Sequence, residues 1–313
     1  MMLFALQEHV QEHAAEPAGK YDAGKTIIEH VSNSSLDHPL IHLPTIAGID
    51  FSVTKHVLML WLVSAFLFLV LSWTVRRYRR QERPLPSGFA NAVEFLVEWI
   101  RDAIVLPNVG KKWVNTWTPL LLTFFVFILC ANAIGLIPVF EVLGVLDHFV
   151  LHTAEGSFAK QVMHGGTTAT ANFNVTAALA TITFGAIIVA GTKAYGFVTH
   201  WKNLVPGGVS KFVYPILIPI EIMGMFVRPF ALTMRLAANM TGGHIAILAI
   251  LSFVFLFTEM AGTALAGIGV GLVVSVPLAV GISGLEILVV LIQAYVFTLL
   301  TAVFIGMAIH VHH

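Results

Sequence analysis

The chain has 313 residues, of which 57% are hydrophobic and only 11% are charged. This composition is typical of a membrane protein and excludes an ordinary soluble domain. The 17 basic and 17 acidic residues give a formal net charge of zero, so the chain lacks the basic excess typical of nucleic-acid binding, and we expect no nucleic-acid partner.

Residues 1–54 are polar. We expect them to form an N-terminal segment on the outer side of the membrane. They carry two histidine pairs with i, i+4 spacing, His9 with His13 and His38 with His42. Such pairs can bind zinc, but no acidic or cysteine ligand completes a site. We therefore expect solvated side chains here, and neither a metal nor a cofactor.

Residues 55–313 predict an all-α membrane domain. A crossing needs about 20 apolar residues. Stretches of that length or longer predict five crossings, at about 55–75, 117–138, 173–192, 212–257 and 268–309. An odd number of crossings without an internal repeat argues against the inverted-repeat design of many secondary transporters.

Residues 88–106 have a different pattern, because their charged and apolar side chains fall on opposite faces of a helix. This predicts an amphipathic helix that lies on the cytoplasmic interface. Trp99, Trp113 and Trp117 are expected to act as interfacial anchors. The charged face comprises Glu94, Glu98, Arg101 and Asp102.

Basic residues indicate the orientation of the chain. Five arginines lie between residues 76 and 83, directly after the first span, and lysines flank later spans. Under the positive-inside rule these ends are cytoplasmic. We therefore expect the N-terminus outside and the C-terminus in the cytoplasm.

The last two apolar segments are unusually long. Each has 40 or more residues, so a continuous helix would be about 60 Å long, twice the thickness of the hydrocarbon core. We expect a long tilted hairpin, bent or broken at prolines.

Arg235 lies near the centre of the first long segment, and its guanidinium stays charged at physiological pH. Glu221, the preceding carboxylate, is some 20 Å away along a helix. The counter-ion is thus expected on another helix, in a water-filled cavity or on another protein. An arginine paired inside the helix bundle is the structural alternative.

Helix geometry groups the polar residues of this segment. At 100° per residue, four of them form one stripe, and His244 lies about 180° round from Arg235. The stripe comprises Glu221, Arg228, Arg235 and Asn239.

The hairpin also predicts which residues lie at the same depth in the membrane. In two antiparallel helices, the residue numbers of two residues at one depth, one from each helix, have a nearly constant sum. Arg235 and Gln293 sum to 528, and His244 and Glu286 sum to 530, so both pairs fit one register to within about 3 Å. Arg235 with Glu286 requires a slip of roughly 10 Å. The register favours an Arg–Gln level and a His–Glu level over a buried Arg–Glu pair.

At these residues the sequence resembles the a subunit of the membrane sector of rotary F-type ATP synthases. The similarity covers most of the chain after about residue 55. It is densest in PIEIMGMFVRPFALTMRLAANMTGGH (219–244), NFNVTAALA (172–180) and LIQAYVFTLL (291–300).

The resemblance implies a non-catalytic stator subunit in a bacterial inner membrane, with lipid, a c-subunit ring, a b-subunit peripheral stalk and the remaining ATP synthase subunits as partners. Arg235 matches the family's essential arginine, which faces the ring carboxylates. Asn239 and Gln293 match polar neighbours that tune it, and Glu221 matches a carboxylate associated with proton passage. The implied mechanism uses two half-channels that do not meet, with Arg235 between them.

The chain departs from some bacterial members at a pair of positions. Those members carry an acid where this chain has His244, and a histidine where it has Glu286. The exchange fits two groups that act as one unit, at the outer half-channel. At Gly135 the chain also lacks an acid that some bacterial members have, which puts an outer-channel role there in doubt.

Two alternatives remain open. Asn172 and Asn174 open the third span, where they can either hydrate a channel mouth or cap the helix. The rival function is an independent secondary transporter that binds an anionic substrate with Arg235. The sequence does not decide between H⁺ and Na⁺ as the transported ion.

Overall fold

The computed structural model describes six parts of the chain: residues 24, 27–28, 52–79, 88–136, 168–203 and 211–310. Its elements are all helices, which confirms the predicted all-α fold for the described residues. Most of the polar segment 1–54, including the two histidine pairs, lies outside them. The boundary expected at residue 54 therefore stays a prediction.

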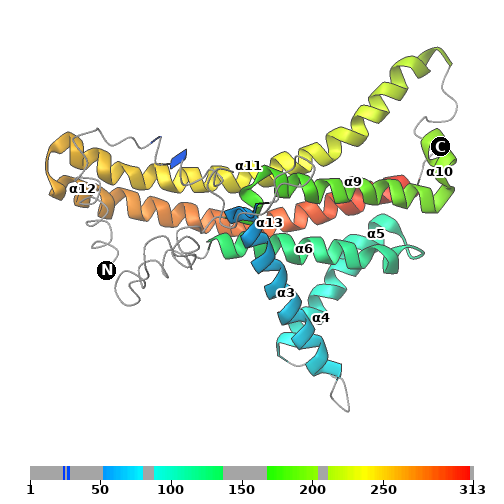
Figure 1. Cartoon of the computed structure of the whole chain (residues 1–313), viewed down its shortest axis with the longest axis horizontal. Helices are drawn as coiled ribbons and strands as arrows, with labels where there is room; N and C mark the ends of the chain where they lie inside the picture. The colour runs from blue at the N-terminus through cyan, green and yellow to red at the C-terminus, as the bar shows by residue number, and fades with distance from the viewer. Residues whose placement is uncertain are drawn as a thin grey trace. The chain divides into compact units, whose positions relative to one another are not determined.

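Five segments are long and apolar enough to cross a membrane, as predicted. They are α3 (Lys55–Arg79), α6 (Val114–Leu136), α9 (Phe173–Tyr195), α11 (Tyr214–Ala261) and the continuous run α12 (Ala264–Val270), η5 (Gly271–Ser275) and α13 (Val276–Ile309). The α-helices among them are labelled in Figure 1. Short helices connect or extend some of these spans: η3 (Ala169–Ala171), α10 (Phe197–Lys202) and η4 (Lys211–Val213).

Helix α11 is one unbroken helix of 48 residues, and it continues through Pro219 and Pro229. The second long segment is interrupted only by a π-helical turn, η5, which is followed by Pro277 in the first turn of α13. A proline has no N–H to donate, so a changed hydrogen-bond pattern before it is expected. The two long helical segments are therefore confirmed, while a break at the prolines is absent from α11 and takes the form of a π-helical turn before Pro277 in the second segment.

The chain divides into two compact units, and helices α3, α6, α11 and α13 contribute to both. Unit 1 comprises Met1–Met59, Ile134–Thr168 and Asn239–Val289, and unit 2 comprises Leu60–Ala133, Ala169–Ala238 and Val290–His313.

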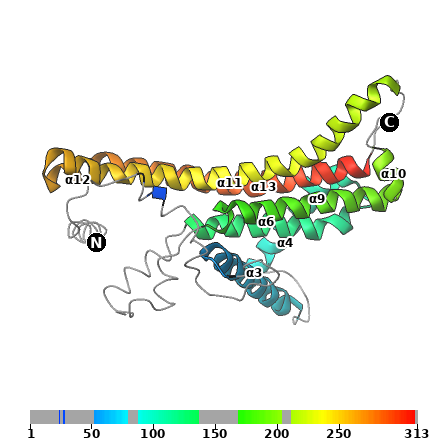
Figure 2. The same ribbon diagram turned by 45° about the horizontal axis from the view of Figure 1, so that its top comes forward.

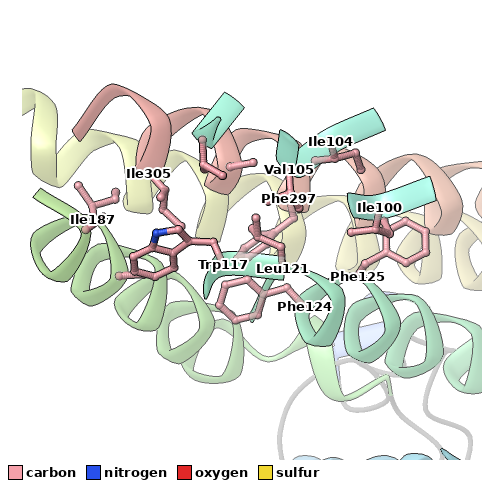
Figure 3. Close-up of a cluster of buried hydrophobic side chains, with 14 of the residues drawn as sticks. Ile100, Ile104, Val105, Trp117, Leu121, Phe124, Phe125, Ile187, Phe297 and Ile305 are labelled. Carbon is pink, nitrogen blue, oxygen red and sulfur yellow. The ribbon is translucent and has the colours of Figure 1, made fainter. Parts of the chain in front are cut away.

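Unit 2 holds a core of aromatic and branched side chains from several helices (Figure 3). In it, α6, α9 and the C-terminal part of α13 lie side by side in both views (Figures 1 and 2). Phe124 of α6 meets Phe297 of α13 edge to face, with ring centroids 5.4 Å apart. Burial of these rings supplies most of the packing energy of such a core.

The amphipathic segment packs on this core through a π-helical turn that the sequence did not predict. It consists of α4 (Phe89–Trp99), η1 (Ile100–Val105) and α5 (Leu106–Val109). The wider π turn brings two adjacent residues, Ile104 and Val105, both into the core. The predicted charged face is exposed: Glu94, Glu98, Arg101 and Asp102.

The predicted tryptophan anchors differ in their surroundings. Trp99 packs against Phe125 and Tyr295, with ring centroids 5.8 and 5.9 Å away, and Trp113 lies under Lys112. Trp117 is only 6% exposed and belongs to the core of unit 2. Its assignment as an interfacial anchor is therefore wrong, because residue 117 is on the buried face of α6.

In unit 1 the C-terminal part of α11 pairs with α12 and η5. A side chain at Gly267 would overlap the Thr258 side chain, and one at Gly271 would meet Val254. Small residues let membrane helices approach closely, since packing rather than hydrophobicity drives their association in lipid. These contacts confirm the predicted helical hairpin.

Candidate functional site

Arg235 lies on the exposed face of α11. The nearby Leu232 and Leu236 are 1% and 0% exposed and join the core of unit 2. Among the residues that the structure describes, no carboxylate forms an ion pair with Arg235. The structural alternative, an ion pair between Arg235 and another residue inside the bundle, is therefore not supported for the described residues, and a counter-ion on another protein stays a prediction.

The residues predicted to share a stripe with Arg235 differ in exposure. Glu221 and Arg228 are half-buried, and Asn239 is exposed. The Arg228 guanidinium carbon lies 5.7 Å from the centroid of the Phe304 ring on α13. A cation over an aromatic face is stabilised without a carboxylate, which explains how Arg228 is accommodated beside apolar helices.

This contact also tests the hairpin register in unit 2. The residue numbers of Arg228 and Phe304 sum to 532, whereas those of Arg235 and Gln293 sum to 528. The difference corresponds to a shift of about 6 Å along the helix axis. Gln293 is 2% exposed, next to Ala294 in the core of unit 2. The common depth of Arg235 and Gln293 is thus consistent with the structure, while a contact between them stays a prediction.

In unit 1 the depth predicted for Glu286 agrees with the structure to within one residue, while a contact between His244 and Glu286 stays a prediction. A Cβ atom on Gly243 would overlap Oε1 of Glu286, so the carboxyl group lies against the backbone next to His244. Gly243 and Glu286 sum to 529, between the two predicted values. Glu286 is 8% exposed, and neither of its carboxyl oxygens has a hydrogen-bond partner in the described part of the chain. A buried, unpaired carboxyl group inside a membrane span is costly to keep and indicates a functional group.

His244 has a hydrogen-bond partner that the sequence did not predict. Its Nε2 lies 2.9 Å from Oγ1 of Thr168, the residue directly before η3. The carbonyl oxygen of Thr168 in turn lies 3.3 Å from Nδ1 of His56, at the start of α3. Thr168 and His56 are 76 and 112 residues away from their partners, so no local spacing signals these contacts.

Gly135 has a steric role in the same place. A side chain at this position would overlap the Thr168 side chain and backbone. The close approach of α6 to Thr168 therefore requires glycine, which gives a physical reason for the missing acid at residue 135. Nothing in the structure assigns this position a proton-carrying role.

Asn172 is the N-cap of α9, where its side-chain oxygen accepts a hydrogen bond of 2.8 Å from the backbone N–H of Asn174. This satisfies a donor that the helix itself leaves unpaired and confirms the capping alternative for Asn172. The Asn174 side chain is exposed. A neighbouring pair that the sequence analysis missed, Asn132 and Thr170, is hydrogen-bonded and fully buried.

No group of three or more histidine, cysteine or acidic residues among the described residues could hold a metal ion. The histidine pairs of the N-terminal segment lie outside these residues. The absence of a metal from that segment stays an expectation.

Comparison with known proteins matches the chain to one family. A family model described as ATP synthase A chain matches residues 57–306. A protein of Chlorobium luteolum named ATP synthase subunit a 2 is 41% identical over 304 residues, which cover 94% of this chain and 79% of the relative. ATP synthase subunit a 2 of Prosthecochloris aestuarii is 38% identical, covering 96% of this chain and 84% of the relative. ATP synthase subunit a of Myxococcus xanthus is 38% identical, with coverage of 85% and 75%.

Proposed function

Because the chain belongs to the ATP synthase A chain family, we propose that it is the non-catalytic stator subunit of a rotary ATP synthase membrane sector. In this role it conducts protons through two offset half-channels to and from the carboxylates of a c-subunit ring. The observation that carries the proposal is the exposed Arg235 on a membrane-spanning helix. The ring, a b-subunit peripheral stalk and the remaining ATP synthase subunits are its partners.

The exposed arginine implies a partner from another chain. A charged guanidinium near the bilayer centre costs about 2.5–3.5 kcal/mol on insertion scales, so lipid alone is a poor environment for it. No described carboxylate of this chain pairs with it. A ring carboxylate that passes this face supplies the missing counter-ion, and the arginine favours the ionised form of that carboxylate.

The outer half-channel includes His244 and Glu286. Glu286 lies against Gly243, the residue before His244, and both His244 and Glu286 have side chains that can gain and lose a proton. Glu286 is buried without a partner in the described part, as is expected of a group held for proton exchange rather than for packing. A proton passes this pair and neutralises a ring carboxylate.

The cytoplasmic half-channel lies near Glu221, fourteen residues before Arg235 on α11. A ring carboxylate crosses lipid in its protonated form, because a buried charge is too costly. It loses its proton after nearly a full turn, near Glu221. Arg235 separates the two half-channels, since a fixed cation blocks a direct proton leak. Each elementary charge moved contributes about 2.3 kcal/mol per 100 mV.

Disulfide cross-linking tests whether this face of α11 meets the ring. In a Cys130→Ala background, Ala238→Cys should cross-link to a cysteine placed one turn from the carboxylate of the c-subunit helix. Ala238 is exposed, three residues from Arg235. Phe66→Cys on α3, where Phe66 is 52% exposed, is the matched control and should not cross-link to that ring position. Cross-linking of the control alone would place the ring elsewhere and refute the proposal.

The proposed orientation, in a bacterial inner membrane, has the N-terminus outside and the C-terminus in the cytoplasm. A cysteine at Ser157 should react with an impermeant reagent from outside, and one at Ser87 only from the cytoplasm. Both positions are assigned from the sequence and lie outside the described residues. The reverse labelling would exchange the two half-channels.

A further inference from the structure

Thr168 connects three separate parts of unit 1. Its hydroxyl lies 2.9 Å from Nε2 of His244 on α11, and its carbonyl oxygen lies 3.3 Å from Nδ1 of His56 on α3. Gly135, near the end of α6, leaves the space that the Thr168 side chain fills. Thr168 is 0% exposed and His56 is 2% exposed, so water does not compete freely for these bonds.

The two bonds of Thr168 have different chemistry. A backbone carbonyl only accepts, so Nδ1 of His56 is the donor in the bond that holds the Thr168 backbone. A hydroxyl both donates and accepts. It can donate to Nε2 of neutral His244, and after rotation it can accept the Nε2–H of the protonated ring.

We propose that Thr168 is the positioning residue that keeps Nε2 of His244 hydrogen-bonded in both protonation states, and that His56 anchors Thr168 for this task. The proposal rests on the proposed function, in which His244 takes part in proton uptake from the outer side. Neither residue carries the transported proton itself. Their role is to hold one ring orientation of His244 while its charge changes.

Among the described residues, the other titratable groups at this place are His56 from α3 and Glu286 from α13, which lies against Gly243. If the Thr168 hydroxyl is removed, the imidazolium of His244 loses an acceptor for its Nε2–H. Hydrogen bonds to a charged group are stronger than those to a neutral one, so the protonated form loses more than the neutral form. Proton uptake then requires a more acidic outer side.

The first test measures ATP synthesis by the complete enzyme in proteoliposomes, at a fixed membrane potential, as a function of the pH on the outer side of subunit a. Thr168→Val keeps the shape and removes the hydroxyl. We expect a rate about tenfold lower and a half-maximal pH about one unit more acidic, as for the loss of one hydrogen bond to a charged group. Thr168→Ser keeps the hydroxyl and should preserve the wild-type profile.

Two results would overturn the proposal. An unchanged pH profile in Thr168→Val shows that the hydroxyl does not act on His244. Equal losses in Thr168→Val and Thr168→Ser show that shape alone matters. His244→Leu separates these failures from failure of the proposed function: if it leaves synthesis unchanged, His244 is not on the proton path and both proposals fall.

The second test distinguishes an anchor from a proton carrier at residue 56. In His56→Asn, the amide nitrogen replaces Nδ1 as the donor to the Thr168 carbonyl but cannot titrate. We expect near wild-type synthesis for His56→Asn, and the low rate and acidic shift of Thr168→Val for His56→Leu. If both His56 variants lose activity equally, His56 carries the proton and is not an anchor.

A third variant covers the case in which the buried substitutions prevent assembly. Gly135→Ala should displace the Thr168 side chain and lower the rate with the same acidic shift, because a Cβ at residue 135 overlaps Thr168. Gly185→Ala on α9 is the control, since nothing lies within 4 Å of a Cβ there. A wild-type pH profile in assembled Gly135→Ala enzyme would refute the positioning role.

Discussion

Glu286 of α13 lies so close to Gly243 of α11 that a Cβ atom on residue 243 would overlap its carboxyl group, so any larger residue there requires the Glu286 side chain to move. The contact places the buried carboxyl group beside the backbone of the residue that precedes His244. It also fixes the depth at which the two long helices meet in unit 1. The residue numbers predicted that Glu286 lies at the depth of His244, and its contact with Gly243 agrees with that depth to within one residue.

Substitution of this glycine should disturb the pair of proton-exchanging groups. Gly243→Ala forces Glu286 to move, and we expect ATP synthesis to fall by about tenfold to a hundredfold, as for other misplaced reacting groups. Alanine favours a helix over glycine by about 0.8–1 kcal/mol, so the loss is not a loss of helix propensity.

Gly284→Ala on α13 is the matched control for this measurement, because a Cβ there meets nothing within 4 Å. It should retain the wild-type rate. Passive proton leak through the membrane sector should stay at the wild-type level in both variants, since Arg235 is intact. Equal activity of Gly243→Ala and Gly284→Ala would show that the position of Glu286 does not matter.

Unlike the glycine variants, loss of Arg235 should increase the passive proton leak through the membrane sector. Arg235→Ala removes the fixed cation between the half-channels, so ATP-driven proton pumping should stop and passive proton conductance should rise. Fluorescence quenching in inverted vesicles measures pumping, and decay of an imposed pH gradient measures leak. Arg228→Ala is the comparison, because Arg228 lies on the same stripe but contacts Phe304. Coupled pumping by Arg235→Ala would be incompatible with the proposed mechanism.

The sequence predicts the helices and the hairpin well because both follow from periodic or continuous apolar patterns. The register follows as well, since two helices of constant rise share a depth wherever their residue numbers have a constant sum. Arg235, Glu286 and His244 stand out because ionisable groups are rare in apolar spans. Such residues are recognisable without a structure.

The sequence does not reveal Thr168 or His56, because their contacts join residues far apart in the chain and depend on tertiary packing. Threonine is common in helical membrane proteins, and nothing local distinguishes residue 168. The burial of Trp117 was also missed, since an aromatic residue near a span end fits an interfacial anchor and a core position equally well. The two π-helical turns leave no signal in the apolar pattern.

The burial of His200, on the short helix α10, leads us to expect that the stability of the folded protein depends on pH. Its ring lies against Gly191 of α9, and it is 7% exposed. Loss of hydration on burial lowers the pKa of His200, so the folded state prefers the neutral ring. The unfolded chain binds the proton more readily. Stability is therefore intact above the ordinary histidine pKa, near 6.5, and falls as the pH drops below it.

Thermal dissociation of the purified complex, followed at several pH values between 7.5 and 5, measures this effect. The wild type should lose stability towards pH 5 faster than His200→Leu, which has no proton to bind at this position. At pH 7.5 the two proteins should differ only by the packing change. Parallel curves over the whole range would mean that His200 does not titrate in the folded state as its burial implies.

The exchange of His244 and Glu286 tests whether these two residues act as one unit. Each single variant, His244→Glu or Glu286→His, leaves two like groups at one level and should slow proton uptake from the outer side. The double variant restores one acid and one base at the depth fixed by Gly243. In a double-mutant cycle on the rate of ATP synthesis, we expect a favourable coupling of at least about 1 kcal/mol. Arg235 is unchanged in all three variants, so none should leak protons. If the two single effects simply add, the side chains act independently, and the common level of the hairpin has no role in proton uptake.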